Sequence, residues 1–300
     1  MRIKSNLLTA GVLLSLIFIA GCVSDSSKSN KDKNVDKIEL SENEPLIDEK
    51  IFYRFPSPEE IFKYVKTSDL QYDSNAANDS ENYKSYLGMQ KQALNLGIYI
   101  SDLSYITMFD QQDESLDYFS AIHSLSEELH IASAFKRPLI DRISDNIDNN
   151  DSLVIIASDA YLDIVNYLGE TDQEDILAFI ASGVLIESLY LTINHITTYD
   201  EKSELLEKII NQKYVVSNIF EFAKQQKEVN SELDDVVADI ELISNIFTKL
   251  KTETKETTVK KTKSKKLIIG GGTKLAINET EFIELKSHIN KIREKYTIKQ

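Results

Sequence analysis

Residues 171–196, TDQEDILAFIASGVLIESLYLTINHI, form the most apolar stretch outside the N-terminus and decide the fold class. Their apolar part, 176–196, holds one charged side chain, Glu187. A helix that is apolar on every side is either buried inside a bundle or crosses a membrane. Glu187, Asn194 and His195 would be costly in lipid. The stretch therefore predicts a central helix that other helices surround.

The rest of the chain also favours helices. The sequence has only nine Gly and four Pro, and no Pro follows Pro138. These two residues cost most inside a helix, and apolar residues recur at helical spacing along the chain. We expect helices at 57–66, 81–109, 113–130, 138–146, 151–168, 176–196, 198–220, 231–250 and 278–297.

Four segments look like helix starts. Each places a small polar residue as N-cap shortly before a Glu, the pattern of a capping box. They are Ser57-Pro58-Glu59-Glu60, Thr171-Asp172-Gln173-Glu174, Thr198-Tyr199-Asp200-Glu201 and Asn278-Glu279-Thr280-Glu281. The first also places Pro at the first helical position, where a missing N–H costs nothing.

The expected fold is therefore all-α: a bundle of about eight helices, and then a C-terminal helix after a Lys/Thr-rich excursion. The single all-helical domain spans 51–300. Within it, 251–277 is expected as an exposed, mobile loop with a small hairpin near its glycines. Residues 278–297 form the terminal helix.

The first 22 residues have the features of a targeting signal. Arg2 and Lys4 precede a run from Leu7 to Ala20 that is almost wholly apolar, as in a secretory signal peptide. The run closes with Ile19-Ala20-Gly21-Cys22, which resembles the lipobox of bacterial lipoproteins. The resemblance implies a signal peptide at 1–21, cleavage after Gly21 and lipid attachment to the sulfur of Cys22.

A polar segment follows the lipobox. Residues 22–50 are rich in Ser, Lys, Asp, Asn and Glu, and such a composition favours a disordered tether. The expected location is the bacterial cell envelope, facing the periplasm or the cell surface, with the membrane bound through Cys22. Val23 rather than Asp follows that residue, which favours the outer membrane where enteric sorting rules hold.

The composition excludes several classes of protein. A net charge of −15 argues against nucleic-acid binding, which needs a cationic face. Cys22 is the only Cys, so no intrachain disulfide is possible. The run Lys249–Lys266 holds eight Lys and two Glu. It suits either contact with anionic headgroups or an acidic partner, or a solvated loop, and the loop is the favoured interpretation.

Motifs for chemistry are missing from the sequence. The triplet 270–272 with Lys274 lacks the further Gly and the spacing of a phosphate-binding loop. The four His (His123, His130, His195 and His288) show no metal-ligand spacing along one helix. We therefore expect no catalytic residue, no metal site and no cofactor.

Two lone acids are the most informative positions. Asp102 and Glu187 each lie within an apolar helical stretch, and a buried carboxylate must be paired, hydrogen-bonded or protonated. Small residues (Ala93, Gly97, Ser101 and Ser104 on one helix, Gly183 on the other) permit close contact between the two helices. Such contact would bring Asp102 and Glu187 near Tyr105 and Tyr190. Two interpretations remain open: a polar pocket for a ligand or for catalysis, or a structural network that fixes helix register.

Residues 89–191 also resemble a group of uncharacterised all-helical lipoproteins of Gram-negative bacteria. The matching pieces are ALNLG at 93–97 with SDL at 101–103, NNDSL at 149–153 and SGVLIESLY at 182–190. The group usually has Gly-Gly-Trp where this chain has Ser182, Gly183 and Val184. The resemblance implies an envelope lipoprotein and supplies no activity or ligand.

The expected function is that of a non-enzymatic envelope lipoprotein, a helical interaction or scaffold module on a flexible tether, whose partner is another envelope protein. The alternative is a helical ligand-binding protein that holds a small molecule or peptide in a polar pocket inside the bundle. A hydrolase would need a nucleophile, a base and oxyanion donors in one cleft, and no motif indicates them.

Overall fold

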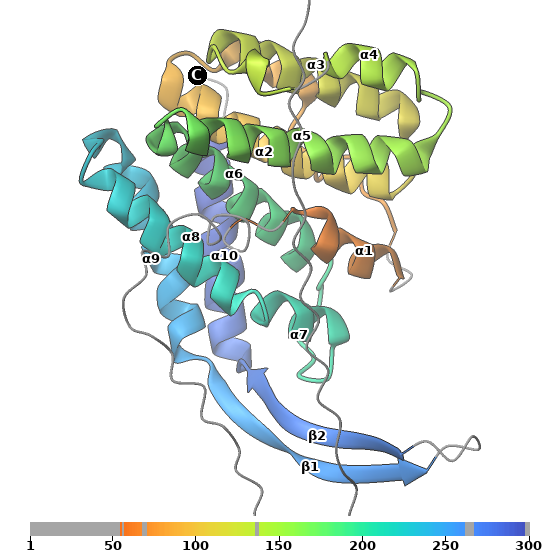
Figure 1. Cartoon of the computed structure of the whole chain (residues 1–300). Helices are drawn as coiled ribbons and strands as arrows, with labels where there is room; N and C mark the ends of the chain where they lie inside the picture. Colours follow the sequence, from red (N-terminus) through yellow and green to blue (C-terminus); the bar gives the residue numbers. More distant parts are fainter. Residues whose placement is uncertain (1–54, 56, 68–70, 136–137, 262–266, 298–300) are drawn as a thin grey trace, which may run out of the picture. The chain divides into compact units, whose positions relative to one another are not determined.

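A computed structural model of the chain describes residues 55, 57–67, 71–135, 138–261 and 267–297. The expected signal peptide, Gly21, Cys22 and the tether at 22–50 lie outside these residues. Within the compact unit Leu46–Gln300, helices make up most of the described chain (Figure 1). The expectation of an all-α bundle is confirmed, with ten α-helices in the described ranges rather than about eight.

The helices and strands occur in the following order. The first half has α1 (Glu59–Thr67), α2 (Met89–Met108), α3 (Gln112–Glu128), α4 (Leu139–Ser144) and α5 (Asn150–Glu170). The second half has α6 (Glu174–Ile193), α7 (Glu204–Ile210), α8 (Lys213–Lys227), α9 (Asp234–Lys249), β1 (Lys251–Lys261), β2 (Leu267–Ala276) and α10 (Glu279–Thr297). Short 3-10 helices cover Ser80–Ser85, Ala132–Ala134 and Ser231–Leu233.

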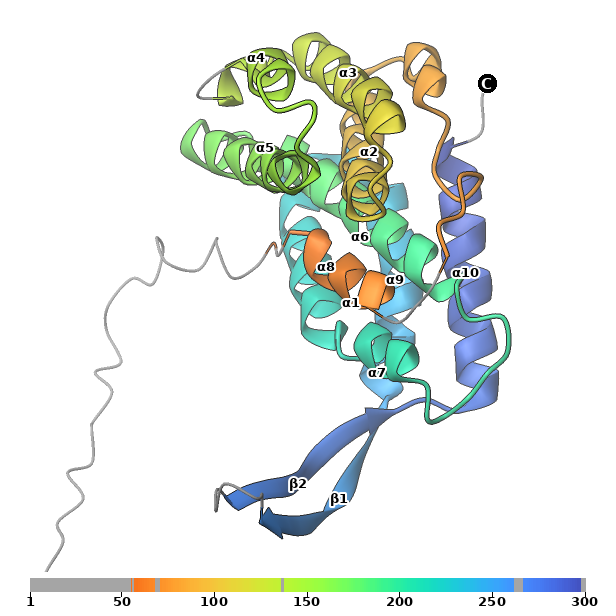
Figure 2. The same cartoon turned by 90° about the vertical axis from the view of Figure 1, so that its right-hand side faces the viewer.

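Helix α6 is the centre of the bundle. Fifteen of its 20 residues are buried, and it packs against α2, α8, α10 and α5 (Figures 1 and 2). The expected central helix is therefore present. Both α5 and α6 are long and apolar enough to cross a membrane by length and composition, a test that the buried core helix of a soluble protein also passes.

Several expected boundaries were wrong. The helix expected at 81–109 begins only at Met89, because Gly88 has a φ of 86° and interrupts it after a 3-10 turn. The helix expected at 198–220 is two helices, α7 and α8, and Ser203 caps the first of them by accepting a hydrogen bond from the N–H of Leu206. Local polar residues compete for the cap position, and the pattern alone does not rank them.

The expected loop at 251–277 is the largest correction. Strands β1 and β2 pair antiparallel, from Lys251 opposite Ala276 to Lys261 opposite Leu267, so the segment is a long hairpin. One bulge interrupts the ladder, with residues 256–257 opposite Gly271. The Thr residues of β1 are β-branched and favour a strand, a preference that the polar composition concealed.

Candidate functional site

The site begins where α2 crosses α6. A Cβ atom on Gly97 would lie 2.0 Å from the carbonyl oxygen of Ile180, and one on Gly183 would lie 2.0 Å from that of Leu94. Each helix thus presses its backbone against the glycine of the other. This reciprocal contact needs a residue without a side chain at both positions.

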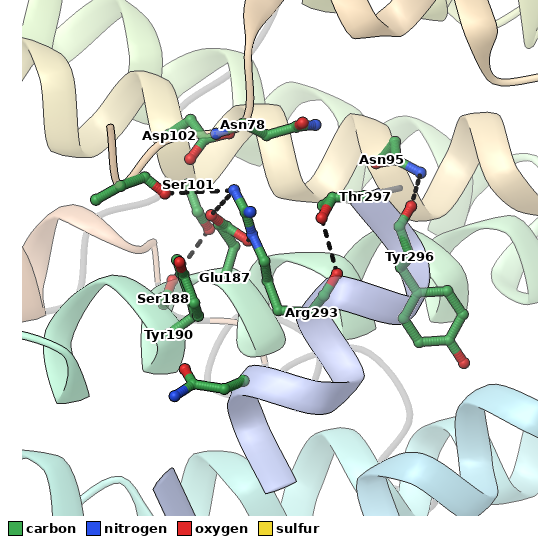
Figure 3. A network of polar contacts seen from close by, with 12 residues as sticks. Asn78, Asn95, Ser101, Asp102, Glu187, Ser188, Tyr190, Arg293, Tyr296 and Thr297 are labelled. Atoms are coloured by element: carbon green, nitrogen blue, oxygen red, sulfur yellow. Dashed lines mark hydrogen bonds and ion pairs between the residues drawn. The ribbon is translucent and has the colours of Figure 1, made fainter. Parts of the chain in front are cut away.

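Two serines extend the crossing by one turn. Ser101 of α2 donates a hydrogen bond to the carbonyl oxygen of Val184 at 3.0 Å, and its Oγ lies 3.0 Å from the Oγ of Ser188 on α6 (Figure 3). Small residues therefore keep the two helices close enough for hydrogen bonds between them. Each serine is adjacent in sequence to one of the two lone acids: Asp102 follows Ser101 on α2, and Glu187 precedes Ser188 on α6.

Asp102 and Glu187 are both completely buried. The structure brings them together between α2 and α6, where each carboxyl group affects the pKa of the other. Two buried carboxylates side by side repel each other, and burial disfavours the charge on each. Their contact therefore requires a cation, a proton or both.

The cation is Arg293 of α10. Its Nε donates to Oε2 of Glu187 at 3.2 Å, and its NH2 group donates to Oε1 at 3.3 Å (Figure 3). The same NH2 group donates to the carbonyl oxygen of Ala76 at 3.3 Å, and the guanidinium lies 4.5 Å from the ring centre of Tyr190. Arg293 thus joins three segments of the chain in one network.

Asp102 has weaker partners. Its Oδ2 accepts a hydrogen bond from the backbone N–H of Asn78 at 3.3 Å, and its Oδ1 accepts none from the part of the chain that the structure describes. Burial, and then the neighbouring Glu187, raise the pKa of Asp102 well above its ordinary value. Burial also raises the pKa of Glu187, but Arg293 opposes that shift. These opposing influences favour the proton on Asp102 and the charge on Glu187.

The loop before α2 completes the network. The side-chain amide of Asn78 donates to the hydroxyl of Tyr86 at 3.1 Å, and that hydroxyl donates to the carbonyl oxygen of Thr297 at 3.3 Å. Tyr99 donates to the carbonyl oxygen of Asp79 at 2.9 Å. This loop, α2, α6 and α10 are therefore held to one another through buried polar groups.

The two tyrosines named from the sequence have different surroundings. Tyr190 lies against Arg293, and its pKa is raised mainly by burial. The Tyr105 hydroxyl accepts from the backbone N–H of Asp73 at 3.0 Å and lies 3.3 Å from Nε2 of His195. Burial raises the pKa of Tyr105 and lowers that of His195, so both are neutral near pH 7. Tyr105 belongs to an aromatic cluster beside the acids.

Sequence reasoning missed Arg293 and Asn78. Arg293 follows Ile292 and lies one turn after Ile289, both buried residues of α10. A cation at that position on the inner stripe of an amphipathic helix was a usable signal, because it implies a buried anion opposite. Asn78 lies in a loop without periodicity, and nothing in its local sequence indicated a buried role.

No group of three or more His, Cys, Asp or Glu in the described residues could hold a metal ion. His195 lies against Tyr105, whereas His123 and His288 lie 3.7 Å from Glu127 and Glu284, each one turn away on its own helix. The network also contains no Ser, Cys or Thr with a basic partner beside it.

Three hollows among the described residues lie elsewhere. The first, about 300 Å³, is bounded by α7, the base of the hairpin and the start of α10, with Tyr199, Lys202 and Lys274 in its wall. The second, about 50 Å³, lies between α1, α6 and α8 and is mostly apolar. The third, about 360 Å³, lies on the surface of α8 beside Phe222 and Lys224. None of the three includes Asp102 or Glu187.

No protein-family model, no curated protein and no solved structure matches this chain. The likeness of residues 89–191 to helical envelope lipoproteins, and that of residues 1–22 to a lipobox, stay predictions.

Proposed function

We propose that the protein is a lipid-anchored, non-enzymatic interaction or scaffold module of the bacterial cell envelope. The observation that carries the proposal is the closed surroundings of its buried acids. Asp102 and Glu187 are completely buried, and Arg293 from a third helix forms an ion pair with Glu187. A cluster closed in this way fixes the packing of α2, α6 and α10 and leaves the outer surface for binding.

The lipid anchor is the second part of the proposal. Its support is the order of basic, apolar and small residues before Cys22, the only thiol of the chain. Two or more acyl chains anchor a protein stably, whereas a single chain binds reversibly. A domain held in this way meets partners within the envelope rather than by free diffusion.

The ligand-binding alternative keeps one supporting observation. The hollow beside α7 has about the smallest volume that small-molecule sites have, and its floor includes the buried Leu206, Ile210 and Ile277. Its wall carries both Lys and Glu side chains, which suits a ligand with both charges. A ligand held there would lie at the surface between the hairpin and α7, and not in the bundle centre.

One experiment in cells tests the proposal. The tagged full chain and its Cys22→Ala variant are fractionated, crosslinked in intact cells and analysed by mass spectrometry. We expect the parent chain in the membrane fraction with one recurrent protein partner, and Cys22→Ala in the soluble fraction with that partner reduced. Unchanged membrane retention of Cys22→Ala would contradict the anchor.

The same samples test the alternative. Native mass spectrometry of the purified chain detects a retained small molecule. A retained molecule that is lost on Lys274→Ala, with no recurrent protein partner, would replace the scaffold proposal by ligand binding. The matched control is Lys213→Ala on α8, which lies in the wall of none of the three hollows.

A further inference from the structure

The hairpin β1–β2 has two open edges. It is a two-stranded sheet, and no third strand pairs with it among the described residues. Its base contacts α7, while its distal part extends beyond the helices (Figures 1 and 2). An isolated two-stranded hairpin is only marginally stable in water, and open edges offer unpaired N–H and C=O groups to another strand.

The two edges differ in sequence. Strand β1, KTETKETTVKK, carries four Lys and a bulge, both of which discourage pairing at an edge. Strand β2, LIIGGGTKLA, has no charge from Leu267 to Thr273 and no Pro. A long, uncharged, apolar edge of this kind is normally covered in natural proteins. The β2 edge therefore offers fewer obstacles to pairing than the β1 edge.

We propose that β2 pairs antiparallel with β2 of a second copy of this chain, about a two-fold axis at Gly271. The result is a continuous four-stranded sheet with the order β1–β2–β2–β1. This inference goes beyond the proposed function, because it rests on the hairpin alone and requires no lipid on Cys22.

The sequence of β2 is complementary to itself in this register. Ile269 stands opposite Thr273 of the second copy, Ile268 opposite Lys274 and Leu267 opposite Leu275, so no like charges oppose each other. In each of these pairs the two residue numbers differ by an even number. This is required when the two-fold axis passes through a residue, here Gly271, rather than between two residues. The glycines 270–272 lie at the axis, where the two backbones need no side-chain clearance.

Charge favours a second copy at β2 and disfavours one at β1. Pairing β1 with β1 would place the Lys-rich strands side by side. In the proposed sheet they are the two outer strands, about 14 Å apart, which exceeds the Debye length of about 8 Å in physiological salt. Their lysines and bulges then discourage a further strand, so the assembly closes as a two-fold dimer.

Disulfide trapping tests the register. Two full-length copies with different tags are co-expressed, one with Ile269→Cys and the other with Thr273→Cys, and cells are mildly oxidised. We expect a mixed disulfide, because these positions oppose each other across the axis. Two Thr273→Cys copies should give none, since those positions are offset by about 13 Å along the strands and a disulfide needs Cα atoms within about 7 Å.

Controls separate this disulfide from background. Copies without an added Cys report crosslinking through Cys22. Replacing Thr273→Cys by Thr254→Cys moves the thiol one strand away, because Thr254 pairs with Thr273 in the ladder. Equal yields from all pairs, or no mixed disulfide from the Ile269→Cys and Thr273→Cys pair, would overturn the proposal.

Two charge substitutions at Ile268 test the proposed β2–β2 interface independently. In detergent, the full chain should sediment as a dimer. Ile268→Lys should weaken the dimer about ten-fold, because it places two like-charged pairs at Lys274, whereas Ile268→Glu should retain it by placing opposite charges there. Both variants lose the same apolar residue, and circular dichroism checks the helices. A monomeric parent chain, or equal effects of the two variants, would overturn the proposal.

Discussion

Arg293 in the last helix holds Glu187, in the middle of the central helix, through both oxygens of its carboxylate. The two residues are 106 positions apart in the chain. Glu187 is completely buried and the Arg293 side chain is 15% exposed, so water contributes little to solvating either charge. The contact therefore ties the end of the chain to its centre, and removing one partner leaves a charge without compensation.

We expect Arg293→Met to lower the free energy of unfolding by about 3–5 kcal/mol, because it leaves the buried Glu187 without its cation. Urea denaturation followed by circular dichroism measures the change. The matched control is Lys295→Met on the same helix, because the Lys295 side chain is 46% exposed and its ion pair with Asp239 should contribute less than about 1 kcal/mol. Equal losses from the two variants would show that Arg293 acts as a surface residue.

The helix crossing gives a second test. Gly97→Ala should destabilise the fold by about 3 kcal/mol, at the upper end of overpacking costs, because the new methyl group meets the backbone of Ile180. Gly88→Ala is the control: its φ is positive but no atom lies within 4 Å, so we expect a loss of about 1 kcal/mol. Thermal unfolding compares the two, and a smaller loss at Gly97 would mean that the helices separate easily.

The sequence predicted those features of the fold that depend on apolar periodicity and on composition. The central helix, most other helices and the burial of Asp102 and Glu187 follow from apolar spacing. The closeness of α2 and α6 follows from Gly97 and Gly183. The partner of Glu187 did not follow, because Arg293 lies 106 residues away and the approach of α10 depends on the whole fold. A small hairpin near the glycines was expected, but its length was underestimated because Thr and Lys are typical of loops as well as of edge strands.

The proton on Asp102 predicts a dependence of stability on pH. The pKa of Asp102 is raised well above its ordinary value of 3.8, chiefly by burial, so the folded protein binds a proton that the unfolded chain releases. This contribution to stability is complete below about pH 4. It is lost as pH rises toward the raised pKa.

Asp102→Asn removes that titration and keeps an N–H donor for Glu187. The difference in unfolding free energy between Asp102→Asn and the parent should therefore grow in favour of the variant as pH rises from 4 to 8. Denaturant titrations at several pH values measure it. Glu114→Gln, at an acid that accepts a hydrogen bond from Tyr72 at the surface of α3, serves as a control for general charge effects. A difference that does not change with pH would mean that Asp102 is ionised in the folded protein.

The last prediction compares two capping boxes that look alike in sequence. At Asn278, the side-chain oxygen accepts from the N–H of Glu281, and Glu281 accepts from the N–H of Asn278, so the box forms. At Thr171 it does not form, because this residue is the C-cap that follows α5 and its hydroxyl donates to the carbonyl oxygen of Tyr167. Asn278→Ala should therefore cost about 1 kcal/mol of unfolding free energy, and Thr171→Ala less than about 0.5 kcal/mol. Denaturation of both variants in one buffer measures the pair, and a larger loss at Thr171 would mean that its hydroxyl caps α6 in solution.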